Sequence, residues 1–327
     1  MLRELYNTIK NIMNITEKIQ DRTVSLGASI ILLCIVMAIV FPGKFATVEN
    51  FSQLMLNLSI DTIVAVGMMV LMIAGMFDLS VGSVVAFAGG MAGYLMYYHD
   101  VNFLIAIAAG LAGSVIIGFV NGWLIAKIGI NPMIQTLAMM GIVRGFALML
   151  SGAGIQNFPY EFIVIGQSKF LGLQTPVWYM FVIVLAFAFL SKNTSFFRRY
   201  YFIGGNEKAA RLSGINVEKM KIWAFVISAT LAGIAGICLS SRLGAALSTS
   251  GRGLELRVIT AVILGGASLS GGFGKIWGAF LGALFMALIN NLLILSRVSG
   301  YWQEVILGTI LIIAVGIDQL LLKKLEK

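Results

Sequence analysis

The chain has 327 residues, of which 59% are hydrophobic and only 11% are charged. Soluble domains carry about 25% charged residues, so this composition leaves too little polar surface to cover a water-soluble globule. The single histidine, His99, and the two cysteines, Cys34 and Cys238, lie far apart in the sequence. They therefore offer no metal-binding cluster, no disulfide framework and no histidine-based catalytic centre.

Ten apolar segments are long enough, some only marginally, to cross a bilayer, because a spanning helix needs about 20 residues. The runs are continuous and do not alternate with polar residues, which favours helices over a β-barrel. The predicted fold is therefore all-α, a polytopic transmembrane helix bundle of about ten spans. In chain order the segments are 24–41, 51–75, 80–98, 102–126, 132–150, 176–191, 222–240, 254–270, 276–295 and 301–322.

Polar residues flank this predicted membrane domain, which covers 23–322. Residues 1–22 carry mixed charge and are expected to form an amphipathic segment on the cytoplasmic face. Residues 323–327 are expected to be a cytoplasmic tail. The first span has no cleavage-like site before the next polar stretch, so we expect it to be retained and not removed as a signal peptide.

The basic residues favour one side of the predicted membrane. If the N-terminus is cytoplasmic and the spans alternate, sixteen lysines and arginines lie inside and six lie on or near the outer face. Only Arg144 falls well within a span, where it could reach the outer face or pair with a carboxylate. This positive-inside asymmetry predicts that both termini are cytoplasmic. It also accounts for the net charge of +9 without a nucleic-acid partner.

Two connections between the predicted spans are long. Residues 151–175 are expected outside the membrane and residues 192–221 inside it, and the inner loop holds seven basic residues. Long ordered loops usually carry function, so the inner loop is the first place to look for a binding surface.

A short helix is expected within this inner loop, over residues 206–214. Asn206 can cap the free backbone donors of the first turn. Glu207 in the first turn and Arg211 in the last complement the helix dipole. Gly214 can adopt the left-handed conformation that ends a helix. About two turns are too short to be stable alone in water, so this helix must dock on another surface.

The centre of the short helix consists of small residues, Ala209 and Ala210. They would allow a partner surface to approach closely. The competing interpretation is a helix that lies against the lipid headgroups or against its own bundle, and the residues alone leave that interpretation open.

Polar residues in or beside the predicted spans are candidates for lining a translocation path. A carboxylate at membrane depth is costly and marks a functional site by default. Amide and hydroxyl groups can exchange hydrogen bonds with a neutral polyol, although the same groups often tie helices together, and Asp78 could serve only as a helix cap. The candidates are Asp61, Asp78, Ser80, Ser83, Asn121, Asn131, Gln135 and Thr136.

The pattern Glu207-x-Ala209-Ala210-xxx-Gly214 resembles the coupling-helix motif of ABC importer permeases. The wider stretch 203–217 is similar, nearly residue for residue, to the ribose-type monosaccharide permease family.

Three further blocks resemble the same family in the same order, at 75–83, 121–145 and 261–272. The resemblance covers roughly residues 50–320. The chain departs from the family pattern at Met76-Phe77, where Gly-Ile is usual, and at Gln135, where a small residue is usual.

The resemblance implies a mechanism and a set of partners. Two permease subunits, identical or paralogous, enclose a path through the bacterial inner membrane. Two cytoplasmic ATPase subunits bind ATP and Mg²⁺ and grip the coupling helices, and an external solute-binding protein delivers the solute. This chain itself would bind no cofactor and catalyse no reaction. The implied coupling-helix residues are Asn206, Glu207, Ala209, Ala210, Arg211 and Gly214.

The sequence shows no nucleotide-binding site, although such a transporter needs one to hydrolyse ATP. Gly271-Gly272-Phe273-Gly274-Lys275 superficially resembles a phosphate-binding loop. That loop requires a glycine at the position of Leu269 and Ser or Thr at the position of Ile276. ATP hydrolysis is therefore expected on a partner subunit.

The solute is expected to be a monosaccharide or similar small polar molecule, with a sugar-like signal or a nucleoside as the alternative within the family. An ion-coupled secondary transporter is a different class, in which Asp61 would be the main coupling carboxylate and Glu304 and Asp318 the others. A membrane enzyme is disfavoured because His99 is isolated and no serine or cysteine has a paired base.

Overall fold

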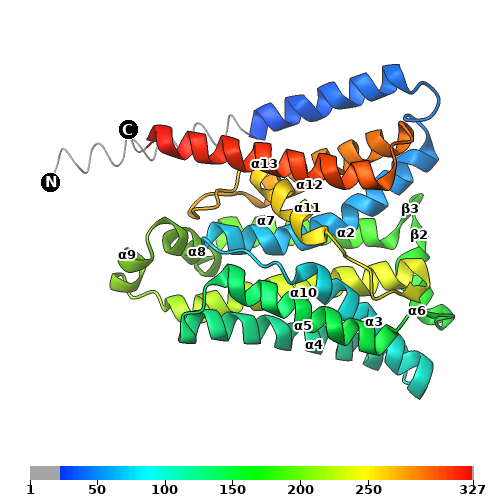
Figure 1. The fold of residues 1–327 in the computed structure, drawn as a ribbon, viewed down its shortest axis with the longest axis horizontal. Helices are drawn as coiled ribbons and strands as arrows, with labels where there is room; N and C mark the ends of the chain where they lie inside the picture. The colour runs from blue at the N-terminus through cyan, green and yellow to red at the C-terminus, as the bar shows by residue number, and fades with distance from the viewer. Residues whose placement is uncertain (1–22, 326–327) are drawn as a thin grey trace.

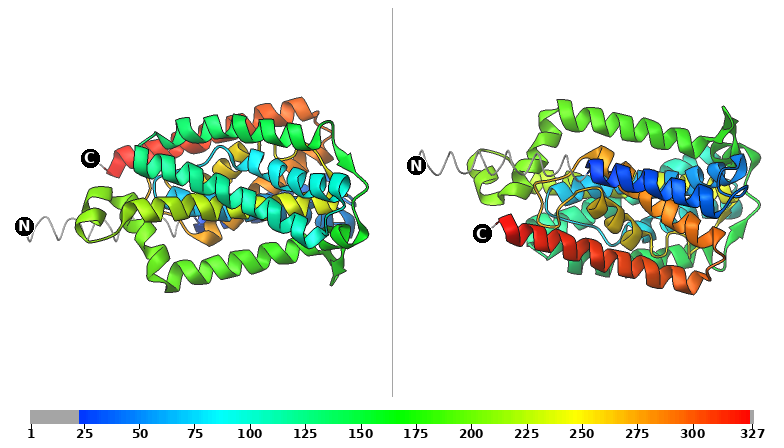
Figure 2. Two further views of the ribbon diagram at one scale, coloured as in Figure 1. Left: turned by 90° about the horizontal axis from the view of Figure 1, so that it is seen from below. Right: turned by 90° about the horizontal axis from the view of Figure 1, so that it is seen from above.

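The computed structural model describes residues 23–325, most of which form helices running along the longest axis of the molecule (Figures 1 and 2). The expected amphipathic segment 1–22, and residues 326–327 of the expected tail, lie outside the described residues. The short helix α9 (Glu207–Leu212) lies at one end of the bundle, and α6 (Tyr160–Gln167) lies at the other (Figure 1). These two ends are called the α9 end and the α6 end.

Eight helices among the described residues are long and apolar enough to cross a membrane. They begin and end within a few residues of the expected segments. They are Thr23–Val40, α2 (Val48–Ile73), α3 (Val81–His99), α4 (Phe103–Trp123) continued by the π-helical turn η1 (Leu124–Ile128), α5 (Pro132–Ser151), α7 (Thr175–Asn193), α10 (Val217–Leu243) and α12 (Ile276–Leu295). A further helix, α13 (Gly300–Leu325), also runs along the bundle (Figure 1).

The two long connections contain short elements. The inner one holds α8 (Ser195–Gly205) and α9. The other holds α6 and most of the short strands, which pair antiparallel as β1 with β4 and β2 with β3. The strands are β1 (Ile155–Gln156), β2 (Lys169–Phe170), β3 (Leu173–Gln174) and β4 (Ala245–Ala246). The predicted helical fold class is confirmed, with these two-residue strands as the exceptions.

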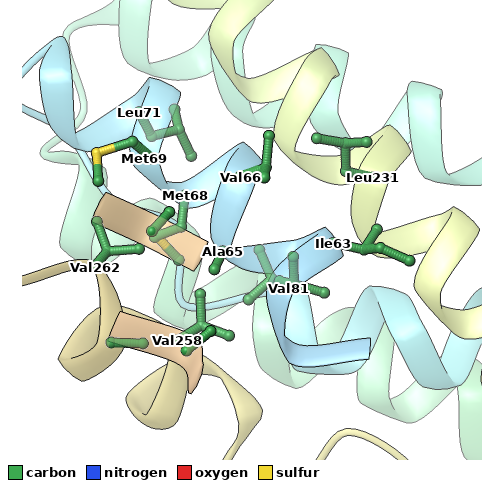
Figure 3. Packing of buried hydrophobic residues seen from close by; sticks show 14 of the residues in the cluster. Ile63, Ala65, Val66, Met68, Met69, Leu71, Val81, Leu231, Val258 and Val262 are labelled. Atoms are coloured by element: carbon green, nitrogen blue, oxygen red, sulfur yellow. The ribbon is translucent and has the colours of Figure 1, made fainter. Parts of the chain in front are cut away.

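The core of the bundle is built around α2. Within its apolar stretch 89% of residues are buried, because α7, α10, α11 and α12 all pack against this helix. Figure 3 shows Ile63 and Met68 of α2 packed with Val81 of α3, Leu231 of α10 and Val258 of α11. By contrast, only 22% of the apolar stretch of α7 is buried. A helix that is apolar all round and exposed in this way suits a lipid environment or a second subunit.

The expected span over 254–270 is wrong as a full membrane crossing. Its helix, α11 (Leu254–Leu264), has only 11 residues and is therefore about 16 Å long, against about 30 Å of hydrocarbon. Gly266 follows the helix with φ of +93°, a left-handed conformation that does not continue an α-helix. The rest of the segment is non-helical and leads to α12 near the α9 end, where the backbone N–H of Gly272 donates to Ile73 O.

The helix α3 begins inside the bundle. Residues 74–80 leave the end of α2 as a non-helical segment and run back between the helices before α3 starts at Val81 (Figure 1). The polar sequence around Asp78 is therefore enclosed by neighbouring helices, and neither Asp78 nor Ser80 has any exposed surface.

Candidate coupling helix and polar sites in the bundle

The short helix expected within 206–214 is present as α9, and its predicted capping is confirmed. The side chain of Asn206 accepts a hydrogen bond from the Ala209 N–H at 3.0 Å. Gly214 follows the helix with φ of +80°, and the Ile215 N–H donates back to Ala210 O at 3.1 Å. Both ends of this two-turn helix are thereby satisfied by local residues.

Ion pairs fasten α9 to the neighbouring helices. Glu207 contacts Lys221 at 2.8 Å and Arg211 at 3.0 Å. Arg211 also lies 3.6 Å from Glu218, and Glu218 pairs with Lys127 of η1. Isolated exposed pairs are worth about 0–1 kcal/mol each, so the importance of this network lies in fixing the orientation of α9 relative to α10 and η1.

Glu207 is held in its charged form by this network. Partial burial acts to raise the pKa of its carboxyl, but the hydrogen bonds from Lys221 and Arg211 outweigh burial and lower the pKa below the ordinary 4.5. The same contacts raise the pKa of Arg211, with the hydrogen bond to Glu207 as the largest cause. The pairs therefore persist throughout the physiological pH range.

The surface of α9 presents one large apolar side chain to the outside. Leu212 is 90% exposed, whereas Ala210 is buried against the chain. Between α8 and α9 lies a surface hollow of about 850 Å³, whose lining includes Arg198, Arg199 and Phe202. An exposed leucine beside a basic hollow is a surface suited to a protein partner.

Four of the candidate pathway residues form a connected chain of hydrogen bonds. Asp78 Oδ1 accepts from the backbone N–H of Ser80 at 2.7 Å and from its hydroxyl at 2.6 Å. The amide of Asn121 donates to Ser80 Oγ at 3.2 Å. The amide of Gln135 donates to Asn121 Oδ1 at 3.2 Å. The chain links the segment before α3 to α4 and α5.

Most of these candidates are closed off from solvent. Asp78, Ser80, Ser83, Asn121 and Thr136 have no exposed surface, and the second carboxylate oxygen of Asp78, Oδ2, has no hydrogen-bond partner among the described residues. The expected capping role of Asp78 is wrong in its detail. The N-cap residue of α3 is Ser80, and Asp78 bonds to this residue and not to the first turn of the helix.

The remaining inner candidates bond locally. Ser83 donates to Met140 O at 3.0 Å, so it joins α3 to α5. Thr136 donates to Pro132 O at 2.8 Å within its own helix. Asn131 is exposed at the start of α5 and accepts from the Met133 N–H at 2.9 Å, so it caps that helix.

Two further charged side chains within the membrane-spanning helices, Asp61 and Arg144, are partly buried. Asp61 of α2 pairs with Arg257 of α11 at 3.3 Å. Arg144 of α5 was expected to reach the outer face or to pair with a carboxylate, and it does neither. Its guanidinium donates to the carbonyls of Ser248 and Ser250 at 2.6 and 2.8 Å. The non-helical segment before α11 exposes these carbonyls, and it thereby satisfies a charge that sequence reasoning could not place.

The sequence also matches a known family over most of its length. Residues 50–315 fit the family model described as branched-chain amino acid transport system / permease component. The chain belongs to this permease family. As a permease component it is a multi-pass membrane subunit and not an enzyme, in agreement with its eight long apolar helices.

Individual relatives of the permease are similar along nearly their whole length. It is 39% identical over 297 residues to the ribose import permease protein of Escherichia coli (strain K12), covering 89% of this chain and 92% of the relative. It is 39% identical to the L-arabinose transport system permease protein of the same strain, covering 86% and 85%. It is 33% identical to the D-allose transport system permease protein, covering 89% and 91%.

Sequence reasoning about the permease missed several partners of its candidate residues. Nothing in the sequence indicates that Lys221, Glu218 and Lys127 are the residues that orient α9. Arg257, one of the six basic residues expected on or near the outer face, pairs with Asp61 of α2. The spacing of Glu207 and Arg211 gave a signal, because residues four apart share a helix face. The sequence contains no such signal for the pairs between residues far apart in the chain.

Proposed function

We propose that this permease is the membrane subunit of a bacterial ABC importer for a monosaccharide, with α9 as the helix that docks on the ATPase. The observation that carries the proposal is α9 itself, capped at both ends, fastened by ion pairs and presenting Leu212 at the end of the bundle. A helix held in this way can transmit a displacement from a partner to the bundle without unfolding.

The proposed solute class rests on the relatives. The ribose, L-arabinose and D-allose permease proteins all resemble this chain over at least 85% of their own length. The family description names branched-chain amino acids, whereas these three relatives are named for monosaccharides. We therefore infer a monosaccharide as the cargo, with a sugar-like signal or a nucleoside as the alternative.

The proposed orientation puts the α9 end in the cytoplasm. The start of the helix Thr23–Val40 and the last described residues of α13 both lie toward the α9 end (Figure 1). This placement supports cytoplasmic termini. Ten membrane segments then alternate, with α11 and the non-helical residues before it together forming one of them. In this arrangement 23–322 is the transmembrane domain and 192–221 is the coupling loop.

The proposed partners follow from the same arrangement. A second permease, identical or paralogous, would complete the path. A cytoplasmic ATPase would supply bound ATP and Mg²⁺, and an external binding protein would deliver the solute to the α6 end. On α9 we assign partner contact to Ala209 and the exposed Leu212, and orientation of the helix to Glu207 and Arg211.

For the path, we assign different roles to two groups of candidates. The buried hydrogen-bonded chain from Asp78 to Gln135 serves to hold α3, α4 and α5 together beside the path. Asp61 is partly exposed, with 20% of its side-chain surface accessible, and is the candidate for solute contact.

Uptake into proteoliposomes tests this function. Vesicles holding the chain with its ATPase and binding protein should import radiolabelled D-ribose, L-arabinose or D-allose only when ATP is supplied to the ATPase. Vesicles holding the chain alone should import none, with or without an ion gradient. Gradient-driven import by the chain alone, abolished by Asp61→Asn, would instead establish the secondary-transporter class.

A further inference from the structure

A polar hollow of about 350 Å³ lies between α2, α10, α11, α12 and α13. It extends to the α6 end of the bundle, where α10 ends and α13 begins. Its volume falls in the range of about 300–1,000 Å³ found for small-molecule sites. The side chains that matter for its chemistry are Asn57, Asp61, Arg242, Arg257, Asn290 and Glu304.

The deepest charged pair of this polar hollow is Asp61 with Arg257. Asp61 lies thirteen residues after Val48, the start of α2, and is therefore about 20 Å from that end of the helix. The accessible share of the side chain is 20% for Asp61 and 31% for Arg257, whereas Asp78 has none. A carboxylate and a guanidinium are thus presented to the hollow at membrane depth.

The Asp61–Arg257 pair retains capacity for further hydrogen bonds. Its two contacts are 3.3 and 3.4 Å long, beyond the usual 2.7–3.2 Å. A carboxylate has about four acceptor sites and a guanidinium five donors, so both groups can also engage hydroxyls. Within the described residues, the side chain of Asn290 makes no hydrogen bond and that of Glu304 makes no ion pair, so both side chains are available as well.

The charges that line the polar hollow balance. Asp61 and Glu304 are matched by Arg242 and Arg257. Arg242 is already engaged, since it donates to the side-chain oxygens of Asn57 and Gln53 at 3.2 and 3.3 Å. A site with paired charges and spare hydrogen-bonding groups suits a neutral solute with many hydroxyls, because such a solute needs no counter-ion.

We propose that this polar hollow is a solute subsite of the path, in which Asp61 accepts hydrogen bonds from hydroxyls of a neutral monosaccharide and Arg257 donates to them. The inference rests on the proposed function, and it adds the location of the contact and the residues that make it. Charge-assisted hydrogen bonds of this kind are about twice as strong as neutral ones, so they give orientation as well as affinity.

The same chemistry disfavours an amino acid as the occupant. A zwitterion would need Asp61 for its ammonium group and Arg257 for its carboxylate, and it would therefore have to separate the existing pair. A polyol can bridge the two groups while they remain together. L-leucine and D-ribose are consequently useful contrasting probes.

Transport by the complete complex tests the subsite. Asp61→Asn and Arg257→Gln should each raise the KM for the imported monosaccharide about tenfold or more, since each removes a charged hydrogen-bonding partner. The matched control is Arg252→Gln, which removes an exposed arginine from the same segment outside the hollow and should leave the KM unchanged.

A charge swap separates solute contact from a structural ion pair. Asp61→Arg combined with Arg257→Asp preserves the pair but exchanges donor and acceptor positions, so import should stay impaired. Recovery of the wild-type KM in the swapped variant would overturn the proposal, as would an unchanged KM in Asp61→Asn.

Cysteine protection provides a test that leaves the pair intact. Asn290→Cys, in a background with Cys34→Ser and Cys238→Ser, should react with a charged thiosulfonate reagent several-fold more slowly in millimolar D-ribose than in millimolar L-leucine. Equal rates would contradict the subsite. If the wild-type complex imports no monosaccharide, the proposed function fails and the subsite with it. If it imports one while the variants and the labelling show no effect, only the subsite fails.

Discussion

The carboxylate of Glu207 and the ammonium group of Lys221 lie 2.8 Å apart, and this contact joins α9 to the first turns of α10. α10 in turn packs on α2, α3 and α4, the helices that enclose the polar chain and part of the polar hollow. A displacement of α9 therefore has a direct physical route into the bundle through a helix that contacts most of the core.

Acidification should loosen the orientation of α9. Because the pKa of Glu207 is lowered below 4.5 in the folded chain, the contribution of its ion pairs is fully present above pH 4.5. It is lost as the pH falls through the lowered value. A nitroxide on Leu212→Cys, with the native cysteines replaced, should keep its mobility from neutral pH down to 4.5 and become more mobile below it. In a Glu207→Gln variant, the same nitroxide should already show this higher mobility at neutral pH.

Gly214 should be indispensable for α9. Proline fixes φ near −65°, whereas Gly214 has φ of +80°, so Gly214→Pro cannot form this turn. We expect it to abolish the stimulation of ATP hydrolysis by loaded binding protein. Gly214→Ala should be milder, with a strain of about 1–2 kcal/mol.

The control for Gly214 is Gly129→Ala, because Gly129 also has a positive φ, of 84°, and has open space around it. This variant carries the same strain at the end of η1 but not on α9. Equal loss of stimulation in both alanine variants would show that strain alone, and not α9, is responsible.

Asn121 should be a stability residue and not a solute contact. Asn121→Leu leaves Ser80 and Gln135 without this hydrogen-bond partner in the interior, which should cost about 1–3 kcal/mol of stability. Thermal unfolding in detergent would measure the loss, and the exposed Asn193→Leu is the matched control. A raised KM with unchanged thermal stability would instead put Asn121 in the path.

The junction of α11 and α12 should tolerate no added side chain at Gly282. A Cβ at this position would lie 1.8 Å from the carbonyl oxygen of Ala261, so the two helices would have to separate. Gly282→Ala should destabilise the chain by about 1–3 kcal/mol, as overpacking does. Gly308→Ala in α13, where no neighbouring atom lies within 4 Å, should be neutral or slightly stabilising.

Much of the fold could be predicted from the sequence because it depends on local properties. Apolar run length located the spans, and capping residues located α9 with both of its ends. The span over 254–270 failed because an apolar run does not show that Gly266 ends the helix, nor that the residues before Leu254 are non-helical.

The candidate sites were less predictable because they depend on pairs distant in sequence. Asp61 and Arg257 are 196 residues apart, and Asn121 meets Ser80 from 41 residues away. Polar residues in a span signal only that they need partners. Whether the partner is another helix, as for Asn121, or a polar hollow, as for Asp61, depends on the packed structure.

The most direct test of the central claim is ATP hydrolysis by the complete complex, stimulated by solute-loaded binding protein, in Glu207→Lys. This variant places a lysine against Lys221 and Arg211, so we expect stimulation and solute import to be lost, while the bundle stays folded and Glu161→Lys at the α6 end has no effect. Adding Lys221→Glu should restore part of the stimulation. Undiminished stimulation and import in Glu207→Lys would contradict the role of α9.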